Sequence, residues 1–161
     1  DSIPERIAVK LIARLEEITT ANSYPVEVVS VDRVNRDGSG WTPRHLSIVI
    51  KQENEQRVPD IDHEGNPPAI GQSTTYTIGG LIRVSDRAGT TQQTLLNNLV
   101  ASIKKAVADT SDWYNWDTLA INSDWEQVEL EESDEGEYTI ALVPLTVIYR
   151  VSETDPFTVR A

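Results

Sequence analysis

Apolar residues near the start of the chain recur every three or four positions, which is the spacing of one face of a helix. They are Ile3, Ile7, Leu11, Leu15 and Ile18. Ser2 and Glu5 have the spacing of a capping box, and Pro4 is tolerated in the first turn of a helix. The pattern predicts a helix that starts at residue 3 and ends in the polar stretch 19–23.

Three strands are predicted after this helix, because β-branched and alternating apolar residues replace the helical spacing. They span residues 26–34, 45–51 and 74–84. A glycine-rich hairpin turn is expected at 36–41. Polar residues and three prolines fill 52–72, which predicts a long loop that is functional or mobile. Gly79 and Gly80 interrupt the third strand, where we expect a kink or the close approach of another backbone.

The second half of the chain repeats this change from helical to strand spacing. A turn at 86–89 leads into a leucine-rich helix, which begins with a Thr-x-x-Gln capping box at 90–93. Two strands, 125–131 and 137–151, follow and are joined by an acidic turn. The apolar positions of the last strand change phase at Pro144, which predicts a β-bulge.

These elements follow the order α-β-β-β-α-β-β along 161 residues, a length that fits a single domain. No repeat, low-complexity stretch or linker divides the chain. The sequence therefore predicts an α+β fold in which two helices pack on a single mixed or antiparallel β-sheet. The domain is expected to span 1–161.

The charge of the chain limits its partners. Acidic residues outnumber basic ones by 26 to 14, and the formal net charge is −12. Tight binding to nucleic acid needs clustered lysine and arginine to displace counterions, and the sequence has no such cluster. No apolar run approaches the ~18 residues of a membrane span. The sequence thus predicts neither specific nucleic-acid binding nor a membrane partner.

Candidate chemistry is sparse. The chain has no cysteine and only two histidines, His45 at a strand start and His63 in the long loop. Asp60, Asp62, Glu64 and Gly65 copy the first half of a calcium-binding EF-hand loop, but the twelfth position is glycine instead of glutamate. Motifs for nucleophilic catalysis or phosphate binding are missing. We therefore expect no catalytic residue, no cofactor and no metal site, and predict that the chain is not an enzyme.

An aromatic cluster follows the second helix. It consists of Trp113, Tyr114 and Trp116, with Trp125 nearby. The rings either close one end of the hydrophobic core or form a partner surface, because tryptophan and tyrosine are enriched at interface anchor points. Both interpretations can hold for different rings.

The end of the chain is similar to the ending of a known family. The residues that carry the likeness are Tyr149, Arg150, Val151 and Ser152, followed by Asp155, Pro156 and Phe157. This ending resembles that of the tail-terminator (tail-completion) proteins of tailed bacteriophages. An N-terminal amphipathic helix that leads directly into a strand, and the order of elements along nearly the whole chain, agree with that family. The long loop 52–72 matches no family pattern.

The resemblance implies a structural virion protein that forms a homohexameric ring on the phage tail. Such a ring caps the tail tube, stops its polymerisation and provides the docking surface for the head-neck connector, while DNA passes through the lumen without specific binding. The implied partners are other copies of the chain, the tube protein and the neck protein, with a sheath protein added in a contractile tail. The chain would act in the virion after assembly in the host cytoplasm.

Ring closure needs two different patches that meet between neighbours. The candidates are the glycine pair, three tryptophans and the C-terminal arm 152–161, by strand addition or arm exchange. The individual residues are Gly79, Gly80, Trp113, Trp116, Trp125, Asp155, Pro156 and Phe157. Two alternatives stay open: another phage neck or tail-tube component, and a small acidic ligand-binding or metal-binding domain that uses the loop 59–66.

Overall fold

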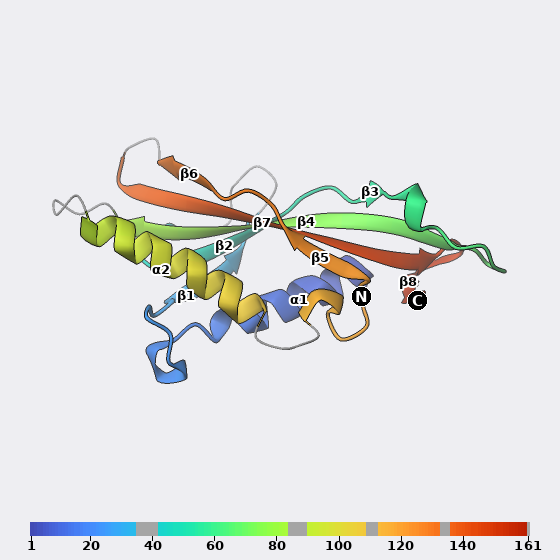
Figure 1. Cartoon of the computed structure of the whole chain (residues 1–161), viewed down its shortest axis with the longest axis horizontal. Helices are drawn as coiled ribbons and strands as arrows, with labels where there is room; N and C mark the ends of the chain where they lie inside the picture. Colours follow the sequence, from blue (N-terminus) through green and yellow to red (C-terminus); the bar gives the residue numbers. More distant parts are fainter. Residues whose placement is uncertain (35–41, 84–89, 109–112, 133–135, 161) are drawn as a thin grey trace.

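Two helices pack on one face of an eight-stranded mixed sheet in the computed structural model, which describes residues 1–34, 42–83, 90–108, 113–132 and 136–160 (Figure 1). The helices are α1 (Ile3–Glu16) and α2 (Thr90–Val107). The strands are β1 (Ser30–Arg33), β2 (Ser47–Gln52), β3 (Gln56–Arg57), β4 (Ala69–Arg83), β5 (Asn122–Trp125), β6 (Glu129–Glu132), β7 (Tyr138–Ser152) and β8 (Asp155–Val159). Three 3₁₀ turns are η1 (Thr20–Asn22), η2 (Pro59–Ile61) and η3 (Trp113–Asn115). The predicted α+β class and element order are confirmed, with short strands added.

The sheet is built on one long antiparallel ladder. Strands β4 and β7 pair without interruption from Ala69 opposite Ser152 to Arg83 opposite Tyr138. Fifteen residues of extended chain span roughly 50 Å. The sheet order is β1-β2-β4-β7-β5, and β3 also pairs with β4. Strands β8, β5 and β6 lie one after another along the outer edge of β7.

Helix α1 forms as its sequence predicts, with differences at both ends. It ends at Glu16, before the predicted stretch 19–23, because Thr19 is extended and caps the separate turn η1. The Ser2 hydroxyl accepts a hydrogen bond from the Glu5 N–H at 3.3 Å, which caps the helix. The Glu5 carboxylate accepts both of its hydrogen bonds from the Arg33 guanidinium at 2.8 Å, so it ties the helix to β1. The capping box is therefore only half formed, because an arginine competes for the glutamate.

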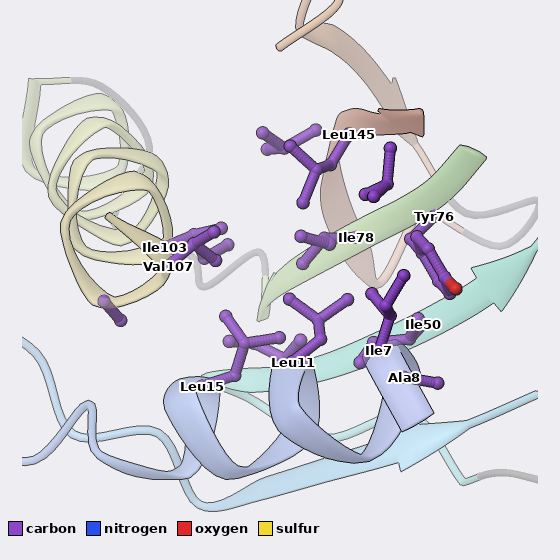
Figure 2. Close-up of a cluster of buried hydrophobic side chains, with 14 of the residues drawn as sticks. Ile7, Ala8, Leu11, Leu15, Ile50, Tyr76, Ile78, Ile103, Val107 and Leu145 are labelled. Carbon is purple, nitrogen blue, oxygen red and sulfur yellow. The ribbon is translucent and has the colours of Figure 1, made fainter. Parts of the chain in front are cut away.

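The hydrophobic core lies between the helices and the sheet. Figure 2 shows α1 and α2 pointing their apolar side chains toward strands β2, β4 and β7. The labelled contributors are Ile7, Ala8, Leu11 and Leu15 from α1, Ile103 and Val107 from α2, and Ile50, Tyr76, Ile78 and Leu145 from the strands. The buried Tyr76 hydroxyl donates to the Pro4 carbonyl at 2.7 Å.

Three predicted extents were wrong. The single strand predicted at 125–131 is two short strands, β5 and β6, which pair with different parts of β7. Residues 26–29 are not part of β1, since this segment crosses from α1 to the sheet and Val26 fills the core. The predicted loop 52–72 holds β3, η2 and the beginning of β4. Its polar residues lie on exposed parts of an elongated sheet, so strand structure does not require an apolar pattern there.

The predicted bulge at Pro144 was also wrong. Pro144 stands opposite Thr77 in unbroken register, and buried positions alternate from Ala141 to Val151. The apparent change of phase arises because Ile140 and Leu142 are apolar although they face away from the helices. A register irregularity occurs instead between β7 and β8, at Val151 and Ser152.

The glycine pair in β4 continues the ladder instead of producing a kink. A Cβ at Gly80 would lie 2.9 Å from Leu99 Cδ2 and 3.2 Å from Ile103 Cδ1, so this glycine lets side chains of α2 reach the sheet. Gly79 faces the opposite side, where Val49 lies beside it. The close approach predicted here is therefore made by helix side chains and not by another backbone.

Gly71 is where η2 packs onto the sheet. A Cβ there would lie 2.2 Å from both Ile61 Cγ1 and the Val58 carbonyl oxygen. We expect Gly71→Ala to lower the free energy of unfolding by about 1–3 kcal/mol, because backbone must move to admit the methyl group. Urea unfolding measures the loss, and faster amide exchange at Val58, whose N–H donates to the Gly71 carbonyl, would locate it.

Gly79→Ala is the matched control, because its Cβ would meet only the ends of side chains and no backbone atom, the nearest being Val49 Cγ2 at 3.0 Å. It should cost less stability and leave exchange in residues 56–61 unchanged. Equal effects of the two substitutions would contradict the role assigned to Gly71.

Several predicted features lie outside the described residues. They are the hairpin turn at 36–41, the turn at 86–89, the threonine side chains of the capping box at 90–93 and the centre of the acidic turn, 133–135.

Candidate assembly surface

The aromatic cluster divides into a core residue and a surface pair. Trp116 is completely buried, and its Nε1–H donates to the Ser123 Oγ at 2.8 Å. The guanidinium carbon of Arg14 lies 4.1 Å from the centre of its ring. The interface role predicted for Trp116 was therefore wrong, because the ring closes the core beneath η3.

Arg14 joins the elements around this ring. Its Nη1 donates to the Val107 carbonyl at 3.1 Å and lies 3.4 Å from the Trp113 carbonyl oxygen. A cation at the C-terminal end of α2 also interacts favourably with the helix dipole. One side chain of α1 thus fixes where α2 ends and where the aromatic segment begins.

Trp113 and Trp125 form the surface pair. Their ring centres are 6.1 Å apart and their planes differ by 20°, which is a stacked arrangement. The Lys104 ammonium lies 6.0 Å from the Trp125 ring centre. Both tryptophans are half-buried, so one edge of the stack remains available to a partner.

The C-terminal segment is a paired strand and not a free arm. Strand β8 folds back on β7, and Val159 lies opposite Val151. Within one chain the described residues of the predicted arm 152–161 are therefore paired with β7, and arm exchange between copies stays a prediction. Within β8, Phe157 remains 59% exposed, so its ring is accessible to solvent.

The conformation of this hairpin is fixed at Asp155. The Asp155 carboxylate accepts hydrogen bonds from the Thr158 hydroxyl and from the Phe157 N–H, the latter at 3.1 Å. These two hydrogen bonds lower the pKa of Asp155. The backbone that carries Phe157 and Pro156 is thereby held in one conformation before any partner binds.

The face of the sheet opposite the helices contains a groove, which we call the acidic-rimmed groove. Its volume is about 630 Å³. The floor is formed by Val49, Thr77, Gly79, Ile140, Leu142 and Pro144, with Val34 at one end. The rim carries Glu53, Glu126, Glu129 and Glu131 together with Gln127 and Lys51. Of the predicted interface glycines, only Gly79 lies here, because Gly80 is buried under α2.

Two residues of the Tyr-Arg ending hold the segment after β2. The buried Tyr149 hydroxyl donates to the Glu55 carboxylate and lies 3.0 Å from the Thr74 Oγ1. Burial, together with the hydrogen bond to Glu55, raises the pKa of Tyr149. The Arg150 Nε donates to the Ile61 carbonyl. These positions therefore have a structural role in this chain.

The loop 59–66 forms no built cation site. Both Asp62 carboxylate oxygens are engaged, one by the Arg57 guanidinium at 2.6 Å and one by the Gly71 N–H at 2.7 Å. The His45 Nδ1 likewise accepts the Arg83 N–H at 2.9 Å. Within the described ranges, no three histidine, aspartate or glutamate side chains gather as metal ligands.

The acidic-rimmed groove was missed in the sequence. Its residues come from β2, β4, β7 and the segment between β5 and β6, which are far apart along the chain. The available signal was that Ile140 and Leu142 are apolar in the opposite phase to Leu145 and Val147. When a strand has apolar residues on both faces, both faces are usually covered by other parts of a protein.

No known protein family and no curated protein matches the chain by sequence. Of the helices in the described part of the chain, none has the length and apolar character needed to cross a membrane.

Proposed function

We propose that this chain is a structural subunit of a phage tail that forms a homohexameric ring. The ring caps the tail tube, stops its polymerisation and presents the surface on which the head-neck connector docks. Its partners are other copies of the chain, the tube protein and the neck protein, with a sheath protein in a contractile tail. The proposal rests on the C-terminal residues that resemble tail terminators and on the α+β element order.

The observation that carries the proposal is the presence of two unlike surfaces on one subunit. The acidic-rimmed groove lies on the face opposite the helices, and exposed Phe157 lies on β8. An interface that joins two different patches is heterologous, and it closes into a ring when the rotation between copies permits. Two unlike surfaces on one subunit are compatible with such a heterologous contact, and this supports the proposal.

The acidity of the chain supports a DNA-conducting ring. Each copy carries a formal charge of −12, so six copies present a strongly negative assembly. A surface of this sign repels phosphate, which lets DNA pass through a lumen without being held. Direct contact with DNA is therefore expected to be weak and independent of sequence.

Mass photometry of the purified chain tests whether it forms the proposed hexamer. We expect a species near six times the 17.9 kDa mass of one chain, at micromolar concentration or when tube ends are added. A strictly monomeric protein that also fails to bind tube ends would refute the proposal.

Electron microscopy of particles that lack the protein separates the related alternatives. Overlong tails are expected for a terminator. Tails of normal length without heads would assign the chain to the neck instead.

A further inference from the structure

We propose that the acidic-rimmed groove binds a basic amphipathic helix of another protein. The apolar stripe of that helix lies on the floor of the groove, and its lysine or arginine side chains reach the glutamates of the rim. The inference needs only a folded subunit, so it can be tested apart from the proposed ring. A ring then closes through Phe157 and a surface other than this groove.

The floor of the groove offers apolar surface with a hollow at its centre. Val49, Gly79 and Leu142 stand opposite one another and form a row across β2, β4 and β7. Gly79 has no side chain, and the position of its missing Cβ lies 3.0 Å from Val49 Cγ2, 3.5 Å from Ile140 Cγ2 and 3.7 Å from Leu142 Cδ2. An apolar hollow of this kind is a typical binding place for the anchor side chains of a partner.

The rim of the groove selects a cationic partner. Four glutamates and one lysine line it, which leaves a surplus of three negative charges. Glu129 and Glu131 stand opposite Leu142 and Ile140 in the ladder of β6 with β7, so both carboxylates are directly beside the floor. Among the described residues, none of the four rim glutamates forms an ion pair. A helix with basic residues on either side of an apolar stripe complements this surface.

The width of the groove fits a helix. Its two walls are β6 and β2, and β7 and β4 lie between them, so the walls are three strand spacings or roughly 14 Å apart. A helix with its side chains is about 10–12 Å wide. A single extended strand is narrower and would leave part of the apolar floor in contact with water. The opposite face of the same sheet is already covered by helices, α1 and α2 (Figure 1).

The occupant is a different protein and not a second copy of this chain. Each copy carries a formal charge of −12, so two copies repel each other whereas a basic protein is attracted. The apolar stripes of α1 and α2 are buried in the core of their own subunit. Neither helix of a second copy can therefore present an apolar stripe to the groove.

Calorimetric titration of the purified chain with a model peptide tests this site. The peptide consists of leucine and lysine, with the leucines along one face of a helix of about 14 residues, roughly 20 Å long. We expect saturable binding. The double variant Glu129→Gln with Glu131→Gln should weaken this binding about five- to tenfold, because two charge pairs are lost. The matched control, Glu16→Gln with Glu17→Gln, removes the same charge at the exposed end of α1 and should change the affinity less than about twofold.

A second pair of variants tests the apolar floor. Leu142→Thr should weaken peptide binding about tenfold, because a leucine that contacts the peptide is lost. Leu130→Thr is the matched control, since Leu130 is 64% exposed and stands opposite Ala141, whose side chain lies in the core on the helix side of the sheet. It should leave the affinity unchanged.

The outcomes separate this inference from the ring. Equal losses in the groove variants and their controls would overturn the inference, because the overall charge alone would then hold the peptide. A lack of saturable binding would overturn it as well. Rings that dissociate when the peptide binds would assign the groove to the contact between copies and overturn the inference. A chain that is monomeric alone and with tube ends, but binds the peptide with the expected differences, would refute the ring and leave this inference standing.

Discussion

Replacing Trp116 by alanine is expected to lower the free energy of unfolding by about 3–5 kcal/mol, the usual effect of deleting a large buried aromatic side chain. Trp116 is fully buried, so the substitution leaves a cavity. It also removes the hydrogen bond to the Ser123 Oγ and the ring against which Arg14 lies. The loss should therefore combine cavity formation with the loss of the surface on which the half-buried Arg14 guanidinium lies.

The backbone around Trp116 adds to this effect. Trp116, Asp117 and Thr118 all have positive φ angles, of 52°, 57° and 74°. Non-glycine residues adopt this conformation at a cost of roughly 1–2 kcal/mol each, so contacts elsewhere must hold the turn. The buried ring and the 2.8 Å ion pair between Asp117 and Lys10 supply those contacts. Without the Trp116 side chain, the turn is expected to relax.

Urea unfolding of Trp116→Ala beside Tyr114→Ala tests this interpretation. Tyr114 is an aromatic residue two positions away and 40% exposed, so its loss should change stability by less than about 1 kcal/mol. Similar losses for the two variants would contradict the structural role assigned to Trp116.

Stability should fall steeply when the pH rises above 10. The pKa of both Tyr76 and Tyr149 is raised above the ordinary value of 10.0, chiefly by burial. Between the unfolded and folded pKa values, the unfolded chain releases protons that the folded chain retains. The free energy of unfolding therefore decreases with pH, by up to about 1.4 kcal/mol per pH unit for each tyrosine. The two together give about 2.7 kcal/mol per unit, and the contribution is complete below pH 10.

Urea unfolding at pH 9, 10 and 11 measures this slope. Tyr149→Phe should remove about half of the slope, and it should also lower stability at neutral pH by about 1–2 kcal/mol because Thr74 and Glu55 lose a partner. Tyr114→Phe serves as the control and is expected to retain the parent slope. A Tyr149→Phe protein with an unchanged slope would show that this hydroxyl is not protected by the fold.

Elements with a periodic apolar pattern could be predicted from sequence. Helix α1 has its buried residues at the predicted spacing, and its first turn is capped by Ser2 as expected. The beginning of β4 could not be predicted in this way. Residues 69–75 are mostly polar or small, and they are in strand conformation because β7 pairs with them along the whole ladder. A partner distant in sequence decided their structure.

The candidate surface was predictable only in part. Phe157 and Asp155 were identified through the resemblance of the C-terminal residues, and Phe157 is 59% exposed, but its interface role stays a prediction. The sequence left two interpretations of the tryptophans open. A left-handed turn at 116–118 directs the Trp116 side chain into the core. No local sequence pattern encodes this turn, so the burial of Trp116 could not be predicted. The groove requires the three-dimensional arrangement of four strands.

The long β4–β7 ladder also determines when this chain can fold during synthesis. Ala69 pairs with Ser152 and Arg83 with Tyr138, so β4 has left the ribosome long before its partner is translated. Contacts between such distant residues form slowly, because a large loop must close first. The groove needs β7 for its floor, and β8 needs β7 for its pairing. A nascent chain therefore acquires both surfaces only after residues 138–159 have been translated, so neither surface can form while β4 still lacks its partner strand.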